Sequence, residues 1–207
     1  MNRNRLINTM NLFHFFSVSI LALGFSGRPL PVAKKIVPTE IVAPVARPEE
    51  SNDFIPWSLD QRLIWDDFQC EPKKGTDAVA STSTTLGIAY EISDGHMTYD
   101  ITCNFSKQKS WGLMKTDYIL AHEQGHFDIT EIFARKLHQA LQNYVFNKRT
   151  FKKDINEIYQ SVVKEKEEFQ KAYDEQTDHS RNRKVQYEWL NQIQQLLDET
   201  QPYSAYP

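Results

Sequence analysis

The chain has 207 residues, of which 40% are hydrophobic and 25% carry a charge, so it is long and apolar enough for one domain with a single core. Its 24 basic and 27 acidic side chains give a net charge of −3. This balance lies outside the strongly basic class of proteins that bind nucleic-acid phosphates, and we expect no nucleic-acid partner.

The N-terminal residues have the plan of a secretory signal peptide. Arg3 and Arg5 precede an apolar stretch over residues 12–25, which ends in small residues of the kind that signal peptidase reads. We therefore predict a signal peptide over residues 1–27 and an exported protein, periplasmic or secreted. An uncleaved membrane anchor is the weaker alternative, because the apolar stretch is shorter than the roughly 20 residues of a spanning helix. We expect no stable membrane insertion once the signal is removed.

Residues 28–53 hold five prolines and almost no large apolar residues, which predicts an extended linker. One folded domain is then expected over residues 54–207. Cys70 and Cys103 are the only two cysteines, and such a pair in an exported chain more often bonds than not, so we expect a disulfide. Neither cysteine lies in a paired motif, which argues against thiolate ligation of a metal.

Two stretches of β-branched and aromatic residues predict a β-hairpin over residues 84–92 and 97–105. The segment between them, Ser93-Asp94-Gly95-His96, has the composition of a hairpin turn. Such a hairpin can cover the core side of a following helix, or its edge can hold a peptide in extended form. The pattern does not choose between these two uses.

The stretch His122-Glu123-Gln124-Gly125-His126 lies in a segment whose apolar residues recur at spacings of three and four, which predicts a long amphipathic helix. Residues four apart on a helix differ by about 40° of rotation and about 6 Å of rise, so both imidazoles can converge on one ion. Glu123 flanks that ion, where a general base for water belongs. Gly125 costs about 1 kcal/mol relative to alanine, so we expect another backbone or a substrate to approach closely there.

A catalytic zinc ion usually has three protein ligands and one open position, so a third ligand is needed. Apolar residues at helical spacing predict two further helices, over residues 151–172 and 185–197. The polar segment between these helices is a joint that can aim a side chain at a neighbouring helix. His179 in this joint is the predicted third ligand, with Asp174 and Glu175 as alternatives. Asp128 and Asp174 are the nearest carboxylates that could instead orient an imidazole.

Several motifs over roughly residues 54 to 198 resemble a family of bacterial proteins described as predicted secreted zinc-dependent proteases. They are Leu63-Ile64-Trp65-Asp66-Asp67-Phe68, the strand from Ala78 to Tyr90, Phe105, Ser110-Trp111, His122 to Ile129, Tyr173-Asp174, Thr177-Asp178-His179, Gln186 and Trp189. The family is similar to the zincin proteases in its helix motif. The resemblance implies a zinc site with Glu123 as base and the segment from Tyr173 to His179 beside it. Cys70 and Ser180 stand where the family pattern leads us to expect glycine.

We therefore expect an α+β, zincin-like metallopeptidase domain: a small antiparallel sheet or hairpin packed on the long motif-bearing helix, followed by C-terminal helices. In the predicted mechanism, one Zn²⁺ per chain is held by His122, His126 and His179, and Glu123 is the general base for hydrolysis of a peptide or protein substrate. Tyr173 is a candidate donor to the developing oxyanion. Two alternatives remain: a non-catalytic exported binding module with a structural or absent metal, and a metal-dependent cell-wall amidase.

Overall fold

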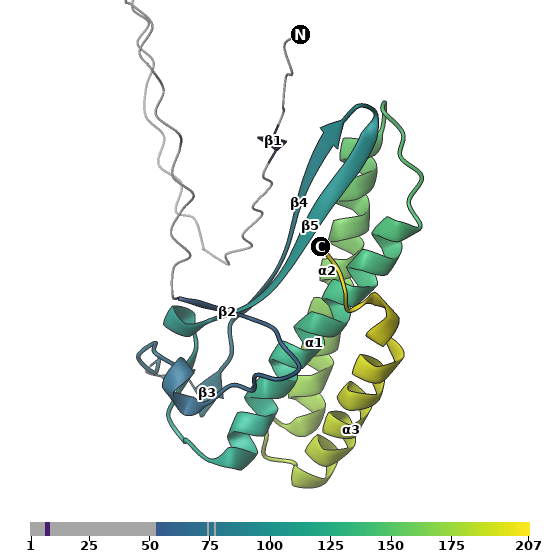
Figure 1. Ribbon diagram of the computed structural model, residues 1–207. Coiled ribbons are helices and arrows are strands. Elements are labelled where there is room, and N and C mark those ends of the chain that lie inside the picture. The colour runs from purple at the N-terminus through teal and green to yellow at the C-terminus, as the bar shows by residue number, and fades with distance from the viewer. Residues whose placement is uncertain (1–6, 9–52, 74, 77) are drawn as a thin grey trace, which may run out of the picture. The chain divides into compact units, whose positions relative to one another are not determined.

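The computed structural model describes residues 7–8, 53–73, 75–76 and 78–207 (Figure 1). The predicted signal peptide over residues 1–27 and the predicted linker over residues 28–53 therefore lie outside the described residues, apart from Ile7, Asn8 and Asp53. Within the described part of the chain, no helix is both long enough and apolar enough to cross a membrane.

The predicted hairpin is confirmed. Strands β4 (Thr84–Ser93) and β5 (His96–Ser106) pair antiparallel, from Thr84 opposite Phe105 to Ser93 opposite His96. Asp94 and Gly95 between them have φ of 53° and 82°. Two positive φ values in a two-residue turn are what a type I′ hairpin requires, which is why Asp-Gly stands there.

Short strands complete two antiparallel sheets. In the first sheet, β1 (Ile7–Asn8) pairs with β4, and β2 (Phe54–Pro56) pairs with β5. In the second, β3 (Ala80–Ser81) pairs with β6 (Trp111–Gly112). Single turns of 3-10 helix are found at Trp65–Asp67, Lys107–Lys109 and Gln201–Tyr203.

The long helix α1 (Asp117–Gln142) carries the His-Glu-Gln-Gly-His stretch, as predicted. Thr116 caps its N-terminus, because the side chain accepts a hydrogen bond from the main-chain nitrogen of Ile119. The helix is central: α2 and α3 pack on it, and the β4–β5 hairpin packs on another side (Figure 1). Its apolar residues, among them Ile129, Ile132 and Leu137 with no exposed surface, form the middle of the core.

The two predicted C-terminal helices are present as α2 (Phe151–Thr177) and α3 (Arg183–Glu199). The first ends five residues later than predicted, so Asp174 and Glu175 lie in the helix and not in the joint. The joint between them contains Asp178, His179 and Ser180, whose φ angles of 50°, 49° and 72° are all left-handed. A left-handed conformation costs a residue other than glycine roughly 1 kcal/mol or more in free energy. Contacts with the surrounding structure must therefore hold the joint in this conformation. Glycine adopts a left-handed φ most readily, so the φ of Ser180 agrees with our expectation of glycine at this position.

Within the described residues, three α-helices and small antiparallel sheets confirm the α+β class. The predicted disulfide is wrong, since Cys70 and Cys103 are both free thiols. Cys103 is 3% exposed and enclosed in the core, whereas Cys70 lies in a loop where its thiol donates to the main-chain oxygen of Glu71. The two thiols therefore lie in different surroundings, one in the core and one in a loop.

Candidate metal centre

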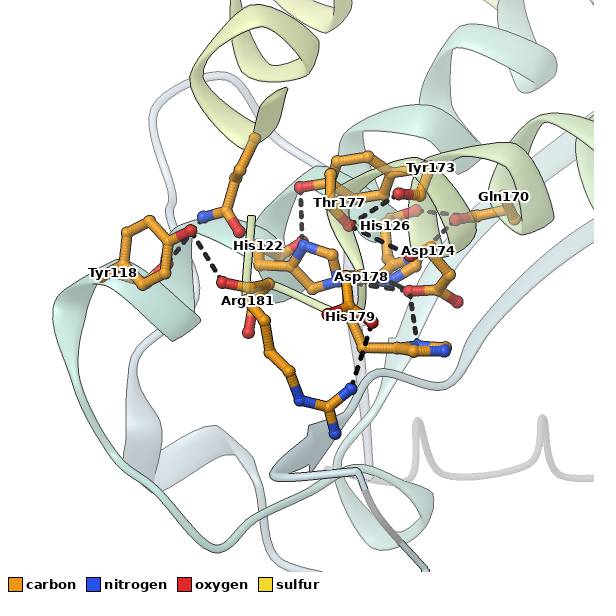
Figure 2. Close-up of polar contacts among 12 residues, drawn as sticks. Tyr118, His122, His126, Gln170, Tyr173, Asp174, Thr177, Asp178, His179 and Arg181 are labelled. Atoms are coloured by element: carbon orange, nitrogen blue, oxygen red, sulfur yellow. Dashed lines mark hydrogen bonds and ion pairs between the residues drawn. The ribbon is translucent and has the colours of Figure 1, made fainter. Parts of the chain in front are cut away.

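Two imidazoles of α1 and one carboxylate of α2 meet at the end of α2 (Figure 2). The Nε2 atoms of His122 and His126 are 3.3 Å apart. The Oδ1 atom of Asp174 lies 3.2 Å from the first and 3.1 Å from the second. These three atoms form a nearly equilateral triangle, and this group could hold a metal ion.

The approach of α2 to α1 depends on Gly125. A Cβ atom at this position would lie 2.6 Å from the Oη atom of Tyr173 and 3.0 Å from its Cζ atom. Real Cβ atoms do not come so close to other heavy atoms, so only glycine lets the Tyr173 ring lie against α1. The close neighbour that the sequence leads us to expect is therefore an aromatic side chain, and not the backbone or substrate that we predicted.

Tyr173 lies beneath the two imidazoles. Its ring stacks on that of His122 at 4.5 Å and meets that of His126 edge-on at 5.0 Å. The side chain has no exposed surface, and its hydroxyl donates to the main-chain oxygen of His122. Burial also raises the pKa of the phenol well above its usual value. This position favours a packing role for Tyr173 over the predicted role of oxyanion donor.

Gln170 determines which nitrogen of His126 is free. The Nε2 atom of Gln170 donates to the main-chain oxygen of His126 at 2.9 Å, so the other end of the amide is an oxygen. That oxygen can only accept, and its partner is Nδ1 of His126. Nδ1 of His126 must therefore carry a proton, so Nε2, the atom that faces Asp174 and His122, is the nitrogen whose lone pair is available to a metal ion in the neutral imidazole.

The protonation of the three groups follows from burial and their mutual contact. Burial lowers the pKa of His122, which keeps this imidazole neutral and able to donate a lone pair. Burial also opposes charge on His126, but the Asp174 carboxylate outweighs it and raises the pKa. Burial alone would raise the pKa of Asp174, whereas hydrogen bonds from both imidazoles, which require a proton on each Nε2 atom, hold that pKa well below the usual value, so the carboxylate is ionised. A metal ion held by the three groups would displace these protons.

Glu123 follows His122 in α1 and is one of the residues that line a cavity. The residue is 4% exposed and belongs to the cavity wall. Among the described residues, its Oε2 atom has no hydrogen-bond partner although it is buried. A buried carboxylate oxygen without a partner is costly, which indicates that water or a ligand in the cavity is its natural partner.

The other predicted site residues lie further out. His179 is on the cavity wall, with Nδ1 at 3.6 Å from Oδ1 of Asp174, but it is not part of the three-residue group (Figure 2). Glu175 points to solvent and pairs with Lys171 at 3.6 Å. Asp128 accepts hydrogen bonds from Trp57, Gln124 and Arg62, so it ties the start of the domain to α1 and does not orient an imidazole.

The cavity has a volume of about 450 Å³ and lies between α2 and residues 78–84. Strand β3 in that segment belongs to a two-stranded sheet, so one of its edges is unpaired among the described residues. The strand edge beside the cavity is thus that of β3, in the segment before the hairpin. The Oγ1 atom of Thr82, on the same wall, is buried without a partner within the described ranges.

Sequence reasoning overlooked Gln170 and Lys166 on the opposite wall. Together with Asp174 they occupy every fourth position of α2, and all three line the cavity. This spacing places them on one face of the helix. The same regularity was available in the sequence as a signal of a polar stripe.

Comparison with known proteins gives one match. A family model described as "Bacterial protein of unknown function (DUF922)" matches residues 61–180. This range contains every residue of the three-residue group, as well as Glu123, Gln170 and His179. No curated protein and no solved structure matches the chain.

Proposed function

We propose that this chain, which belongs to the family of bacterial proteins of unknown function (DUF922), is an exported zinc-dependent peptidase with a zincin-like domain. The observation that carries the proposal is that the buried Oε2 atom of Glu123 has no partner among the described residues, although Glu123 lines an open cavity beside the group of His122, His126 and Asp174. A purely structural metal site needs neither an adjacent acid nor an open cavity, which favours catalysis over a binding module.

The dimensions of the group fit zinc. Two ligands of a tetrahedral zinc ion, each about 2.0–2.1 Å from the metal, are about 3.3 Å apart. The three separations of 3.1, 3.2 and 3.3 Å match one face of such a tetrahedron. Two imidazoles and a carboxylate are also a donor set that zinc accepts. We therefore propose Asp174 as the third ligand, in place of His179.

The metal group and the residues around it would each perform a separate part of amide hydrolysis. A zinc ion held there would supply Lewis acidity, lowering the pKa of water toward 7 and polarising the scissile carbonyl. Glu123 takes a proton from the attacking water and passes it to the leaving amine. His179, which lies on the cavity wall beyond Asp174, is the candidate donor of a hydrogen bond to the oxyanion, in place of Tyr173.

The substrate expected for this cavity is an extended peptide. The unpaired edge of β3 offers main-chain hydrogen bonds of the kind that hold a peptide as an added strand. Hydrolysis of an amide in a cell-wall peptide would need the same chemistry, so a metal-dependent cell-wall amidase remains the alternative function. The test is hydrolysis of a complex peptide mixture, read by mass spectrometry, before and after removal of metal by a chelator. Cleavage that persists without metal would exclude the proposal.

Gln170 should matter for metal affinity although it does not touch the metal. Replacing it with leucine removes the acceptor that holds Nδ1–H of His126, so we expect zinc to bind about 10- to 100-fold more weakly. Competition with a chromogenic chelator measures this constant. The matched control is Gln195→Leu, at an exposed glutamine of α3. Equal zinc affinity of the Gln170→Leu protein and the control would contradict the assigned role.

A further inference from the structure

Lys166 is a buried cation on the wall of the cavity. The residue is only 8% exposed and contributes to the wall together with Gln170 and Asp174 of the same helix face. Burial of an ammonium group is costly unless the charge is paired. In the described part of the chain, Lys166 has one ion pair, to Oε1 of Glu167 at 3.0 Å.

That ion pair is a weak partner for a buried charge. The Glu167 side chain is 66% exposed, so water screens its attraction. Neighbouring residues on a helix also point in different directions, so Glu167 must bend back to reach Lys166. Glu167 also lines the cavity, so a carboxylate of a bound ligand can replace the Glu167 carboxylate as the partner of Lys166.

The rest of the wall supplies no competing cation. The opposite side, residues 78–84, consists of alanine, valine, serine and threonine. Among the described lining residues, Lys166 is the single lysine or arginine. A ligand group that seeks a positive charge in this cavity away from the metal group would therefore find it at Lys166.

The spacing of Lys166 and Asp174 along α2 gives the distance between the Lys166 position and the metal group. Eight residues separate Lys166 from Asp174, which is about 12 Å of helix rise. An extended peptide advances about 3.4 Å per residue, so this length corresponds to three or four residues. We propose that Lys166 binds a carboxylate of the peptide substrate three or four residues from the cleaved bond, either an acidic side chain or the C-terminal carboxylate. This inference rests on the proposed peptidase function.

Binding can be tested without cleavage. Zinc-loaded protein carrying Glu123→Gln is titrated against octapeptide pools whose fluorescent label has no carboxylate and whose variable positions hold no acidic residue, and fluorescence anisotropy is read. One pool ends in a carboxylate and one in an amide. Two further amide pools carry a single glutamate or a single glutamine. A charge-assisted contact should make one carboxylate-containing pool bind about 10- to 100-fold more tightly than its neutral counterpart, and this identifies the source.

Two variants with opposite effects identify the residue responsible. Lys166→Met should abolish the preference for carboxylate, whereas Glu167→Gln should increase it, because the internal competitor is gone. A Lys166 with only a structural role would produce no gain in the Glu167 variant. The control is Lys164→Met, at an exposed lysine of the same helix whose ion pair is with Glu168.

The outcomes separate this inference from the function on which it rests. Equal binding of all pools, absence of binding, or a preference that survives Lys166→Met would overturn the Lys166 subsite. A preference that depends on Lys166 in a protein whose wild-type form hydrolyses no peptide would uphold the subsite and reject the peptidase function.

Discussion

Replacing Glu123 with glutamine is expected to lower the rate constant for peptide hydrolysis by about 100- to 10,000-fold and to leave bound zinc unchanged. Glutamine has the same size as glutamate, so the buried position beside His122 is kept. The amide cannot take a proton from water, however, and the step assigned to Glu123 is lost. The measurement is kcat on a cleaved peptide, with zinc content determined by elemental analysis of the same sample.

The matched control for this variant is Glu175→Gln. Glu175 lies on α2 one residue from Asp174, but its carboxylate is exposed and pairs with Lys171. The same chemical change there should alter neither kcat nor zinc content. Full activity of the Glu123→Gln protein would rule out Glu123 as the base, and a loss of zinc would assign it to the metal group.

Asp174→Ala should lose nearly all bound zinc, whereas His179→Ala should keep it. Asp174 contributes one corner of the triangle with the two Nε2 atoms, so its removal leaves only two of the three ligands that a catalytic zinc usually has. His179 lies beyond that corner, 3.6 Å from the carboxylate. Its loss should instead lower kcat by about 100- to 1,000-fold, as removal of an oxyanion donor does.

The comparison is made on purified proteins by elemental analysis, with thermal unfolding as a check that both variants are folded. Zinc retained by Asp174→Ala and lost by His179→Ala would exchange the two roles and return His179 to the position of ligand. Zinc lost by both would make them joint ligands.

Much of this fold follows from local pattern. The apolar period of α1 predicts a helix because residues three and four apart share a face, whatever packs against it. The turn at Asp94 and Gly95 predicts the hairpin because few residues accept two successive positive φ angles. The convergence of His122 and His126 is local in the same sense, since their spacing alone brings the two rings together.

The partners of those rings are not local. Asp174 and Gln170 are 52 and 44 residues away from His122 and His126 respectively, and they reach the imidazoles only because α2 packs on α1. Periodicity predicts that α2 has a buried face, but it does not say which turn of α1 that face meets. The spacing therefore left His179, Asp174 and Glu175 as candidates for the third ligand and overlooked Gln170.

The sequence by itself determined the hairpin, the three long helices, the pair of histidines and the acid beside them, because each depends on the regular geometry of a single helix or turn. Only the tertiary structure decided that Asp174 meets both imidazoles, that Tyr173 lies buried against Gly125, that the two cysteines remain apart, and that Lys166 lines the cavity. The reason is that these contacts depend on how side chains of separate elements pack together, and the spacing of residues along the chain does not specify that packing.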